Sequence, residues 1–229
     1  MPETETKPAL SSAIEDYTKA IYALQERGEQ PASTNDLAAR LGVSPASASG
    51  MVKRLDELGL ARHERYRGVR LTERGRRVAL EVMRHHRLLE LYLVQNLGVP
   101  WDRVHDEAEV LEHVLSDELE ELIAAKLGNP TRDPHGDPIP TRELTIDDVP
   151  SESLQTLEVG ERGRFSRISD SDPDMLRFLA DRGIAPGDGL EVVDKQPFGG
   201  PLFVRFGHRD EVHVLGGRLA AAMRVEPVA

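Results

Sequence analysis

One segment constrains the fold of the N-terminal third more than any other, STNDLAARLGVSPASASGMVKRLDELGL. Ser33 or Thr34 stands where a helix cap is expected, ahead of apolar residues at helical spacing. Gly42 marks a tight turn, Pro45 suits the first turn of a second helix, and Gly59 ends that helix. A helix, a glycine-containing turn and a second helix are typical of a helix-turn-helix module.

The second helix of this module is predicted to lie in the major groove of DNA. Its small exposed residues allow a close approach, and its hydroxyls and lysine suit phosphate contacts. None of the candidates on the helix is Arg, Asn or Gln, so we expect DNA shape and phosphate geometry to carry much of the specificity. The candidate DNA-binding residues are Ser44, Pro45, Ala46, Ser47, Ser49, Gly50, Lys53 and, in the following segment, Arg67.

The segments on either side complete the module. Residues 12–27 have apolar positions at helical spacing, and Gly28 is predicted to end that helix. LARHERYRGVRLT predicts two short strands around Tyr66, Arg67 and Gly68, which would form a basic wing. The alternative is an ordinary three-helix unit with a solvated basic surface.

Charge is distributed unevenly along the chain. The formal net charge is −11, yet residues 40–87 are rich in Arg and residues 105–126 are rich in Asp and Glu. This asymmetry predicts one module for polyanions followed by one for cations. The chain has no cysteine and no apolar run of roughly 18 residues, so we expect a cytoplasmic protein with no disulfide and no membrane partner.

The acidic part contains the run HDEAEVLEH, from His105 to His113. On a helix, His105, Glu109, Glu112 and His113 fall on one stripe. An earlier segment adds His86 and Glu90 at a spacing of four residues. Convergent imidazoles and carboxylates are typical of a site for a divalent metal ion.

These donors are predicted to lie on two long helices. The first is capped by Thr72 and ends at Gly98, and the second extends from about Trp101 to Leu127. The second helix carries more apolar residues than one small domain needs, which favours a two-fold dimer interface. They are Val110, Leu111, Val114, Leu115, Leu119, Leu122 and Ile123.

The remainder of the chain has a different pattern. Residues 130–153 are rich in Pro, Asp and Ser and are interpreted as an extended linker. From Leu154 on, short alternating strands with glycine turns and one short helix predict a small barrel. The fold class is therefore mixed α+β, with a winged helix-turn-helix domain (1–72), a helical metal-binding and dimerisation domain with linker (73–150) and a small SH3-like barrel (151–229).

These segments together resemble the diphtheria toxin repressor (iron-dependent repressor) family over essentially the whole chain. The resemblance rests on IEDYTKAIYAL, the helix-turn-helix, VMRHHRLLELYL, VHDEAEVLEHVLSDE and GNPTRDPHGDPIP. It implies a homodimer that binds palindromic double-stranded operator DNA when loaded with iron(II) or manganese(II) and controls metal uptake genes. The barrel is similar to the SH3-like (FeoA-like) domain of the longer members.

The resemblance also implies two metal sites. The primary site would use Asp16, Glu109, Glu112 and His113, and an ancillary site would use His86, Glu90 and His105. The barrel can lend ligands to the ancillary site, and here Asp172 suits that role whereas Met175 departs from the family's amide. Lys19 departs from the short manganese regulators, so separate sites are expected rather than their two-metal cluster.

Asp16 and Glu109 make the chain similar to the manganese transport regulator branch. The iron sensors carry Met and Cys at the matching positions, and carboxylates suit the harder Mn²⁺ better than sulfur does. The prediction is a manganese(II)-activated repressor that is not an enzyme and has no small organic substrate. An iron(II)-dependent repressor of the same family is the first alternative. A metal-dependent hydrolase or metal buffer is the alternative of a different class.

Overall fold

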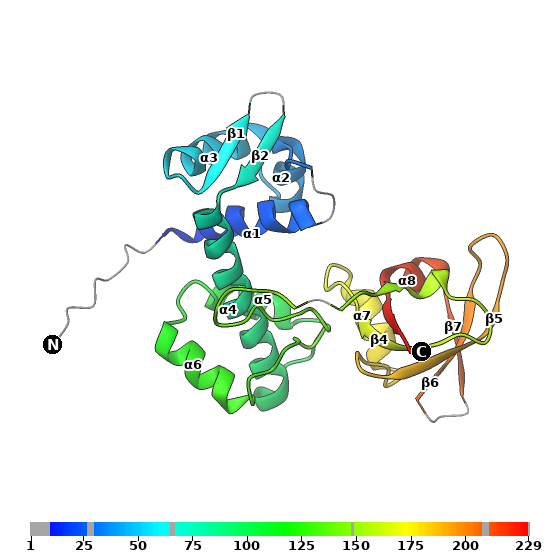
Figure 1. Ribbon diagram of the computed structural model, residues 1–229. Coiled ribbons are helices and arrows are strands. Elements are labelled where there is room, and N and C mark those ends of the chain that lie inside the picture. The colour runs from blue at the N-terminus through cyan, green and yellow to red at the C-terminus, as the bar shows by residue number, and fades with distance from the viewer. Residues whose placement is uncertain (1–9, 27–29, 65–66, 148, 208–210, 229) are drawn as a thin grey trace. The chain divides into compact units, whose positions relative to one another are not determined.

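The computed structural model describes residues 10–26, 30–64, 67–147, 149–207 and 211–228 (Figure 1). It divides into two compact units, Met1–His85 with Arg142–Thr145, and His86–Thr141 with Ile146–Ala229. Helix α4 (Glu73–Leu97) begins in the first unit and ends in the second. The mixed α+β class predicted from the sequence is confirmed.

The first unit is a winged helix-turn-helix. Its elements before α4 are α1 (Ser12–Glu26), α2 (Thr34–Leu41), α3 (Pro45–Glu57), β1 (Ala61–Glu64) and β2 (Gly68–Leu71). The two strands form an antiparallel hairpin. Ile21, Leu37, Val52 and Leu55 are wholly buried and join the three helices in one aliphatic core.

Local sequence signals explain the turn between α2 and α3. The Ser33 side chain caps α2 by accepting the Asp36 N–H at 3.1 Å, and Ser44 caps α3 by accepting the Ser47 N–H at 3.1 Å. Gly42 ends α2 with a φ of 64°, a conformation that glycine adopts without a steric penalty. The predicted helix stop at Gly28 and wing residue Tyr66 lie outside the described residues.

The wing and the start of α4 are held to the rest of the first unit. Ala32 and Val69 exchange two backbone hydrogen bonds of 3.0 and 2.9 Å, which attach β2 to the segment before α2. At the base of the wing, the Thr72 hydroxyl donates to the Gly59 carbonyl at 2.8 Å. A Cβ on Gly75 would lie 1.9 Å from the Leu60 carbonyl oxygen, so only glycine fits at this position in the first turn of α4.

The helical part of the second unit corrects one prediction. The single helix expected from about Trp101 to Leu127 is two helices, α5 (Val104–Leu111) and α6 (Asp117–Lys126). The chain leaves the helix after Leu111, and Ser116 restarts it by accepting the Leu119 N–H at 3.3 Å. The acids of the first turn of α6 favour this start, because the N-terminal end of a helix carries partial positive charge.

The predicted linker is also different from expectation over its first half. Residues 130–141 have no regular secondary structure, yet Asp133, His135 and Ile139 are buried. The Asp133 carboxylate accepts the backbone N–H groups of His135 and Asp137 at 2.8 and 2.9 Å. This segment, which we call the Asp133–Ile139 loop, is a packed part of the second unit rather than an extended connection.

The C-terminal part is a small antiparallel barrel, as predicted (Figure 1). Its strand order is β3-β8-β4-β5-β6-β7, and Phe165, Val192, Val204 and Val225 lie in its core. The elements are β3 (Glu152–Ser153), η1 (Leu154–Thr156), β4 (Arg162–Arg167), α7 (Pro173–Ala180), β5 (Gly189–Lys195), β6 (Leu202–Phe206), β7 (Val212–Leu215), α8 (Gly217–Ala222) and β8 (Arg224–Pro227). Where the helical domain ends and the barrel domain begins stays a prediction.

Among the described residues, no helix has both the length and the apolar character needed to cross a membrane.

Candidate metal centre and DNA-binding surface

The candidate DNA-binding residues lie on one exposed side of α3 and at the wing. All six candidates between Ser44 and Gly50 are exposed, and the Lys53 side chain is 79% exposed. Two of them contact residues of the same helix: the Ser49 hydroxyl donates to the Pro45 carbonyl at 2.8 Å, and the Lys53 ammonium lies 3.9 Å from the Glu57 carboxylate. At the wing, the Arg67 guanidinium is likewise exposed and lies 3.5 Å from Glu64. The arrangement is compatible with approach to a flat or grooved polyanion.

Three predicted metal ligands and one unexpected residue gather in the second unit. His86 and Glu90 project from α4, His105 projects from α5, and Asp170 lies between β4 and α7. These four residues, here called the α4–α5 cluster, each offer one ligand atom, and the four atoms lie within 4.8 Å of one another. Such convergence of two imidazoles and two carboxylates fits a divalent metal ion.

The distances within the α4–α5 cluster are short. His86 Nε2 lies 3.1 Å from Glu90 Oε1 and 3.2 Å from His105 Nδ1. His105 Nδ1 lies 2.8 Å from Asp170 Oδ2. Glu90 is 1% exposed and His86 is 7% exposed, so these charges are enclosed by protein. A buried carboxylate of this kind requires a cationic partner, either a proton-bearing imidazole or a metal ion.

The pKa shifts follow from this packing. Hydrogen bonds to Asp170 and then to Glu90 raise the pKa of His105 to about 10, against the opposing effect of burial. Burial alone would raise the pKa of Glu90, but the neighbouring imidazoles of His105, His135 and His86 hold it well below its usual range. These shifts favour a protonated His105 imidazole beside charged Glu90 and Asp170 carboxylates when no metal is bound.

A second group of predicted ligands lies next to the first. His86 turns its other nitrogen, Nδ1, toward Glu112 Oε2 at 2.5 Å and Glu109 Oε1 at 3.8 Å. His113 Nε2 lies 3.5 Å from Glu112 Oε1, and Glu112 is 1% exposed. Glu112 is the C-cap of α5, its N–H donating to the Ala108 carbonyl at 2.9 Å, and His113 follows in the turn before α6. His86 thus lies between the two predicted sites and contacts donors of both.

The remaining predicted ligands are Asp16 and Asp172. Asp16 lies on α1 of the first unit and is partly buried. Asp172 does not join the α4–α5 cluster: it caps α7 by accepting the Met175 N–H, and it lies 2.9 Å from Arg218. Asp170, two residues earlier, takes the position expected for the barrel's carboxylate. Met175 contributes its backbone N–H to the Asp172 cap and packs against the barrel core.

Sequence reasoning also missed Asp133 and His135, which border the α4–α5 cluster. His135 Nδ1 lies 3.7 Å from Glu90 Oε2, and its ring stacks on Trp101 with centroids 5.7 Å apart. Burial would lower the pKa of His135, but Glu90 and Asp133 raise it to about 9. The only signal in the sequence is a histidine between Pro134 and Gly136, since the segment has no periodicity from which to infer facing side chains.

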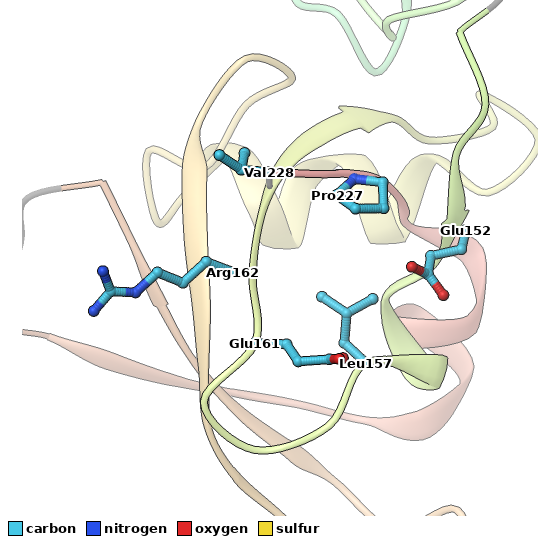
Figure 2. A pocket seen from close by; sticks show the side chains of 6 residues that line it. All are labelled: Glu152, Leu157, Glu161, Arg162, Pro227 and Val228. Atoms are coloured by element: carbon cyan, nitrogen blue, oxygen red, sulfur yellow. The ribbon is translucent and has the colours of Figure 1, made fainter.

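A shallow pocket on the barrel offers no comparable donors (Figure 2). Its lining residues are Glu152, Leu157, Glu161, Arg162, Pro227 and Val228. None of them is a histidine, and Figure 2 shows the arginine side chain directed away from the two carboxylates. The candidate site is therefore the pair of groups around His86.

Three family models match consecutive parts of the chain. Residues 9–69 match the N-terminal DNA-binding domain of the iron-dependent repressor, residues 72–141 match its metal-binding and dimerisation domain, and residues 152–227 match the FeoA domain. The iron-dependent repressor IdeR of Mycobacterium tuberculosis is 36% identical over 231 residues, covering 96% of this chain and 99% of the relative.

The chain belongs to the iron-dependent repressor family. The chain is also 33% identical to the diphtheria toxin repressor of Corynebacterium efficiens, over 96% of this chain and 97% of that protein. Among solved structures, a manganese-dependent transcriptional repressor in complex with manganese is 44% identical, with a TM-score of 0.85, over 94% of this chain and all of that one. The manganese regulator SloR is 29% identical, with a TM-score of 0.72, over 94% of this chain and 98% of that one. The protein is a metal-dependent transcriptional repressor, and its relatives include both iron- and manganese-dependent proteins.

Proposed function

We propose that this repressor is activated by manganese(II) and binds palindromic operator DNA in the cytoplasm as a homodimer, to control metal uptake genes. One observation carries the choice of metal: every donor assigned to the two sites is an imidazole nitrogen or a carboxylate oxygen, and the chain has no cysteine. Nitrogen and oxygen donors suit Mn²⁺, whereas thiolate and thioether donors favour later and softer ions. The 44% identical structure with bound manganese supports the same choice.

The ligands are assigned to two sites. The primary site takes Asp16 with Glu109, Glu112 and His113, and the ancillary site is the α4–α5 cluster, in which Asp170 replaces the Asp172 expected from the sequence. A bound divalent cation supplies positive charge that neutralises these carboxylates in place of protons. Glu112 and Glu90, both almost fully buried, fit such a role because an uncompensated buried carboxylate is costly.

The primary site explains how metal controls DNA binding. Asp16 belongs to the unit that contains α3, and the other three ligands belong to the second unit. An ion held by both fixes the DNA-binding helix relative to the dimerisation part, and so sets two such helices one DNA turn apart, about 34 Å. Without the ion, the carboxylates repel one another and DNA binding must include the ordering of the two units.

The homodimer is supported by an unusual surface on α5 and α6. Val110 is 72% exposed, Val114 is 78% exposed and Leu122 is 62% exposed. Leu119 is exposed as well, so α5, α6 and the turn between them carry four large apolar side chains that a monomer would leave in water. Exposed apolar residues gathered in one segment are typical of protein interfaces, and a two-fold axis would pair this segment with its own copy.

Replacement of one carboxylate from each side of the primary site tests the proposal. Asp16→Ala and Glu109→Ala should each raise the manganese concentration needed for operator binding. The loss of an outer-shell partner typically costs about 10- to 100-fold in metal affinity, and the loss of a direct ligand should cost no less. Glu107→Ala is the matched control, because Glu107 is an exposed carboxylate on the same helix as Glu109. Gel retardation across a manganese titration measures the effect. A wild-type response in both primary-site variants would contradict the proposed site.

The alternative within the family is an iron(II) sensor, and metal ranking separates the two. Asp16→Met together with Glu109→Cys should broaden activation from manganese toward iron(II), cobalt(II) and nickel(II), because sulfur ligands raise affinity for later ions. The readout is operator retardation with each metal in turn under anaerobic conditions, and Glu107→Cys controls for the added thiol. An unchanged ranking would remove metal selectivity from these two positions.

A metal-dependent hydrolase or a metal buffer is the alternative of a different class. A catalytic metal keeps an open coordination position in a cleft with a general base. The donors of the α4–α5 cluster lie between α4, α5 and the barrel, and the other unit of the same chain carries a helix-turn-helix. Regulation of DNA binding is therefore the better explanation. Failure of the protein to retard its own upstream DNA at any metal concentration would favour the hydrolase or buffer.

A further inference from the structure

His135 is a buried histidine that the two metal sites do not use. It lies in the Asp133–Ile139 loop, is 1% exposed, and faces the side of Glu90 opposite to His86 and His105. Glu90 Oε1 points to His86 and His105, at 3.1 and 3.6 Å, whereas Oε2 points to His135 Nδ1 at 3.7 Å. One carboxylate oxygen is thus directed to the α4–α5 cluster and the other to this loop.

The hydrogen bonds identify what the His135 ring does. Its Nε2 lies 2.8 Å from the carbonyl oxygen of Trp101, which only accepts hydrogen bonds, so Nε2 carries a proton. The ring is fixed in orientation by this bond and by stacking on the Trp101 indole at an interplanar angle of 15°. Nδ1 consequently faces Glu90 Oε2 and no other carboxylate closer than 4 Å among the described ion pairs.

The loop that holds His135 is attached to the barrel. The Ile168 N–H donates to the His135 carbonyl at 2.9 Å, and Arg132 lies 2.8 Å from Glu226 of β8. Gly136 has a φ of 88°, and a Cβ there would lie 1.9 Å from the Ser166 carbonyl oxygen, so the loop backbone is pressed against β4. The position of the His135 ring is therefore set by the docked barrel.

Glu90, Asp133 and His135 also bring three ligand atoms within 4.8 Å of one another, which raises the possibility of a separate metal site. Their hydrogen bonds argue against it. Asp133 Oδ1 already accepts two backbone N–H groups, at 2.8 and 2.9 Å, and Oδ2 lies 3.7 Å from the Arg87 guanidinium. An arginine beside the carboxylate would repel a cation, so this group is a support for the loop.

We propose that His135 is a positioning residue, which holds the Glu90 carboxylate by its Oε2 and presents Oε1 to the metal of the α4–α5 cluster. Because its ring is placed by the barrel, His135 makes the metal affinity of this site depend on barrel docking by a route separate from Asp170. Outer-shell partners of this type orient a ligand and change metal affinity by about 10- to 100-fold when they are removed. The inference rests on the proposed ancillary site.

Three substitutions in the full chain separate the two nitrogens of the ring. His135→Phe keeps the ring packing on Trp101 and removes both polar contacts. His135→Asn retains a donor near the position of Nδ1, toward Glu90, and His135→Gln retains one near Nε2, toward Trp101. The matched control is His213→Phe, since His213 is also buried, stacks edge-on against Phe206 and touches no residue of the cluster.

Manganese binding is followed by electron paramagnetic resonance, which counts free Mn²⁺ during a titration, and thermal unfolding is measured with and without the metal. His135→Phe and His135→Gln should weaken the class of site that uses Glu90 about 10- to 100-fold and change the affinity of the other class much less. His135→Asn should restore part of the affinity, and His213→Phe should match wild type. The increase in unfolding temperature caused by manganese should shrink in His135→Phe even when the metal-free protein unfolds as wild type.

Three results would overturn the inference. In the first, His135→Phe lowers metal-free stability and keeps the full manganese-dependent increase, as a purely structural residue would. In the second, His135→Gln retains affinity and His135→Asn loses it. In the third, His135→Phe removes one equivalent of manganese entirely while both other classes persist, which would make His135 a ligand of its own site. The proposed ancillary site is tested separately by His105→Ala: if that variant binds manganese as wild type does, the ancillary site itself is wrong.

Discussion

At the scale of single residues, the candidate metal centre is governed by imidazoles packed against carboxylates, two of which, Glu90 and Glu112, are almost fully buried. His86 is the central residue, because its two nitrogens contact Glu90 on one side and Glu112 on the other. A cation at either site alters the surroundings of the same ring. We therefore expect metal binding at one site to affect metal binding at the other. The reason is that metal binding displaces protons from its ligands, and His86 contacts carboxylates of both sites.

The protonated imidazoles predict how metal-free stability changes with pH. The pKa is raised to about 10 for His105 and to about 9 for His135, both above the ordinary value of 6.5. A group whose pKa is higher in the folded state stabilises the fold fully below its unfolded pKa, and this stabilisation disappears as the pH rises through the folded pKa. Burial raises the pKa of the Asp133 carboxyl to about 8, which acts in the same direction.

We therefore expect the unfolding temperature of the metal-free protein to fall as the pH rises from about 7 to about 10. Differential scanning calorimetry in the presence of a chelator measures this fall. Because lysines and tyrosines also titrate near the upper limit, the comparison is with His105→Gln and His135→Phe, in which the fall should be smaller. Equal slopes in all three proteins would show that these two imidazoles do not carry the effect.

The sequence predicted the candidate ligands that share a helix, and it failed where candidate ligands come from irregular segments. His105 and Glu109 on α5, and His86 and Glu90 on α4, follow directly from helical spacing. Asp170 was not found because SDSDPD offers several equivalent carboxylates, and the one that is free to face His105 is decided by the cap that Asp172 forms on α7. His135 reaches Glu90 through a folded loop, for which spacing carries no information.

At the scale of secondary structure, α3 combines a stability cost with a function. Gly50 is exposed in the interior of α3, and no atom lies within 4 Å of the place where its Cβ would be. Alanine there should stabilise the protein by about 1 kcal/mol, because glycine is a poor helix former. If α3 lies in the major groove as proposed, a methyl group there would also hold the helix farther from the DNA.

Gly50→Ala is thus expected to raise the unfolding temperature and to weaken operator binding at saturating manganese. Urea unfolding and gel retardation measure the two effects. Gly75→Ala is the matched control. It should lower the unfolding temperature, because the added Cβ would collide with the Leu60 carbonyl. Unimpaired operator binding by Gly50→Ala would mean that this face of α3 does not enter the groove.

The element boundaries followed the sequence where caps are unambiguous. Ser33 caps α2, Gly42 ends it and Pro45 begins α3, as expected. The continuous helix predicted from about Trp101 to Leu127 was wrong because apolar periodicity continues across Glu112–Ser116, although the backbone leaves the helix there. Ser116 followed by Asp117 and Glu118 is a start signal that could have indicated the break. The break matters for the site, since Glu112 forms the C-cap of α5 and His113 lies in the turn that follows it.

At the scale of the whole molecule, the proposed mechanism makes metal and operator DNA two ligands of one equilibrium. Metal at the primary site favours the arrangement of the two units that binds DNA, so DNA must favour the arrangement that binds metal. Thermodynamic linkage requires the two effects to be equal: the factor by which manganese tightens operator binding is the factor by which operator tightens manganese binding. Typical couplings of this kind are about 5- to 150-fold.

The prediction is tested by titrating manganese into the protein with and without a saturating amount of operator duplex, and by titrating operator with and without manganese. The two ratios of dissociation constants should agree. Asp16→Ala should reduce both ratios toward one, because it removes the ligand contributed by the DNA-binding unit. His105→Ala should leave most of the coupling in place, since none of the α4–α5 cluster belongs to that unit. Full coupling in Asp16→Ala would mean that metal controls DNA binding by a route that does not pass through α1.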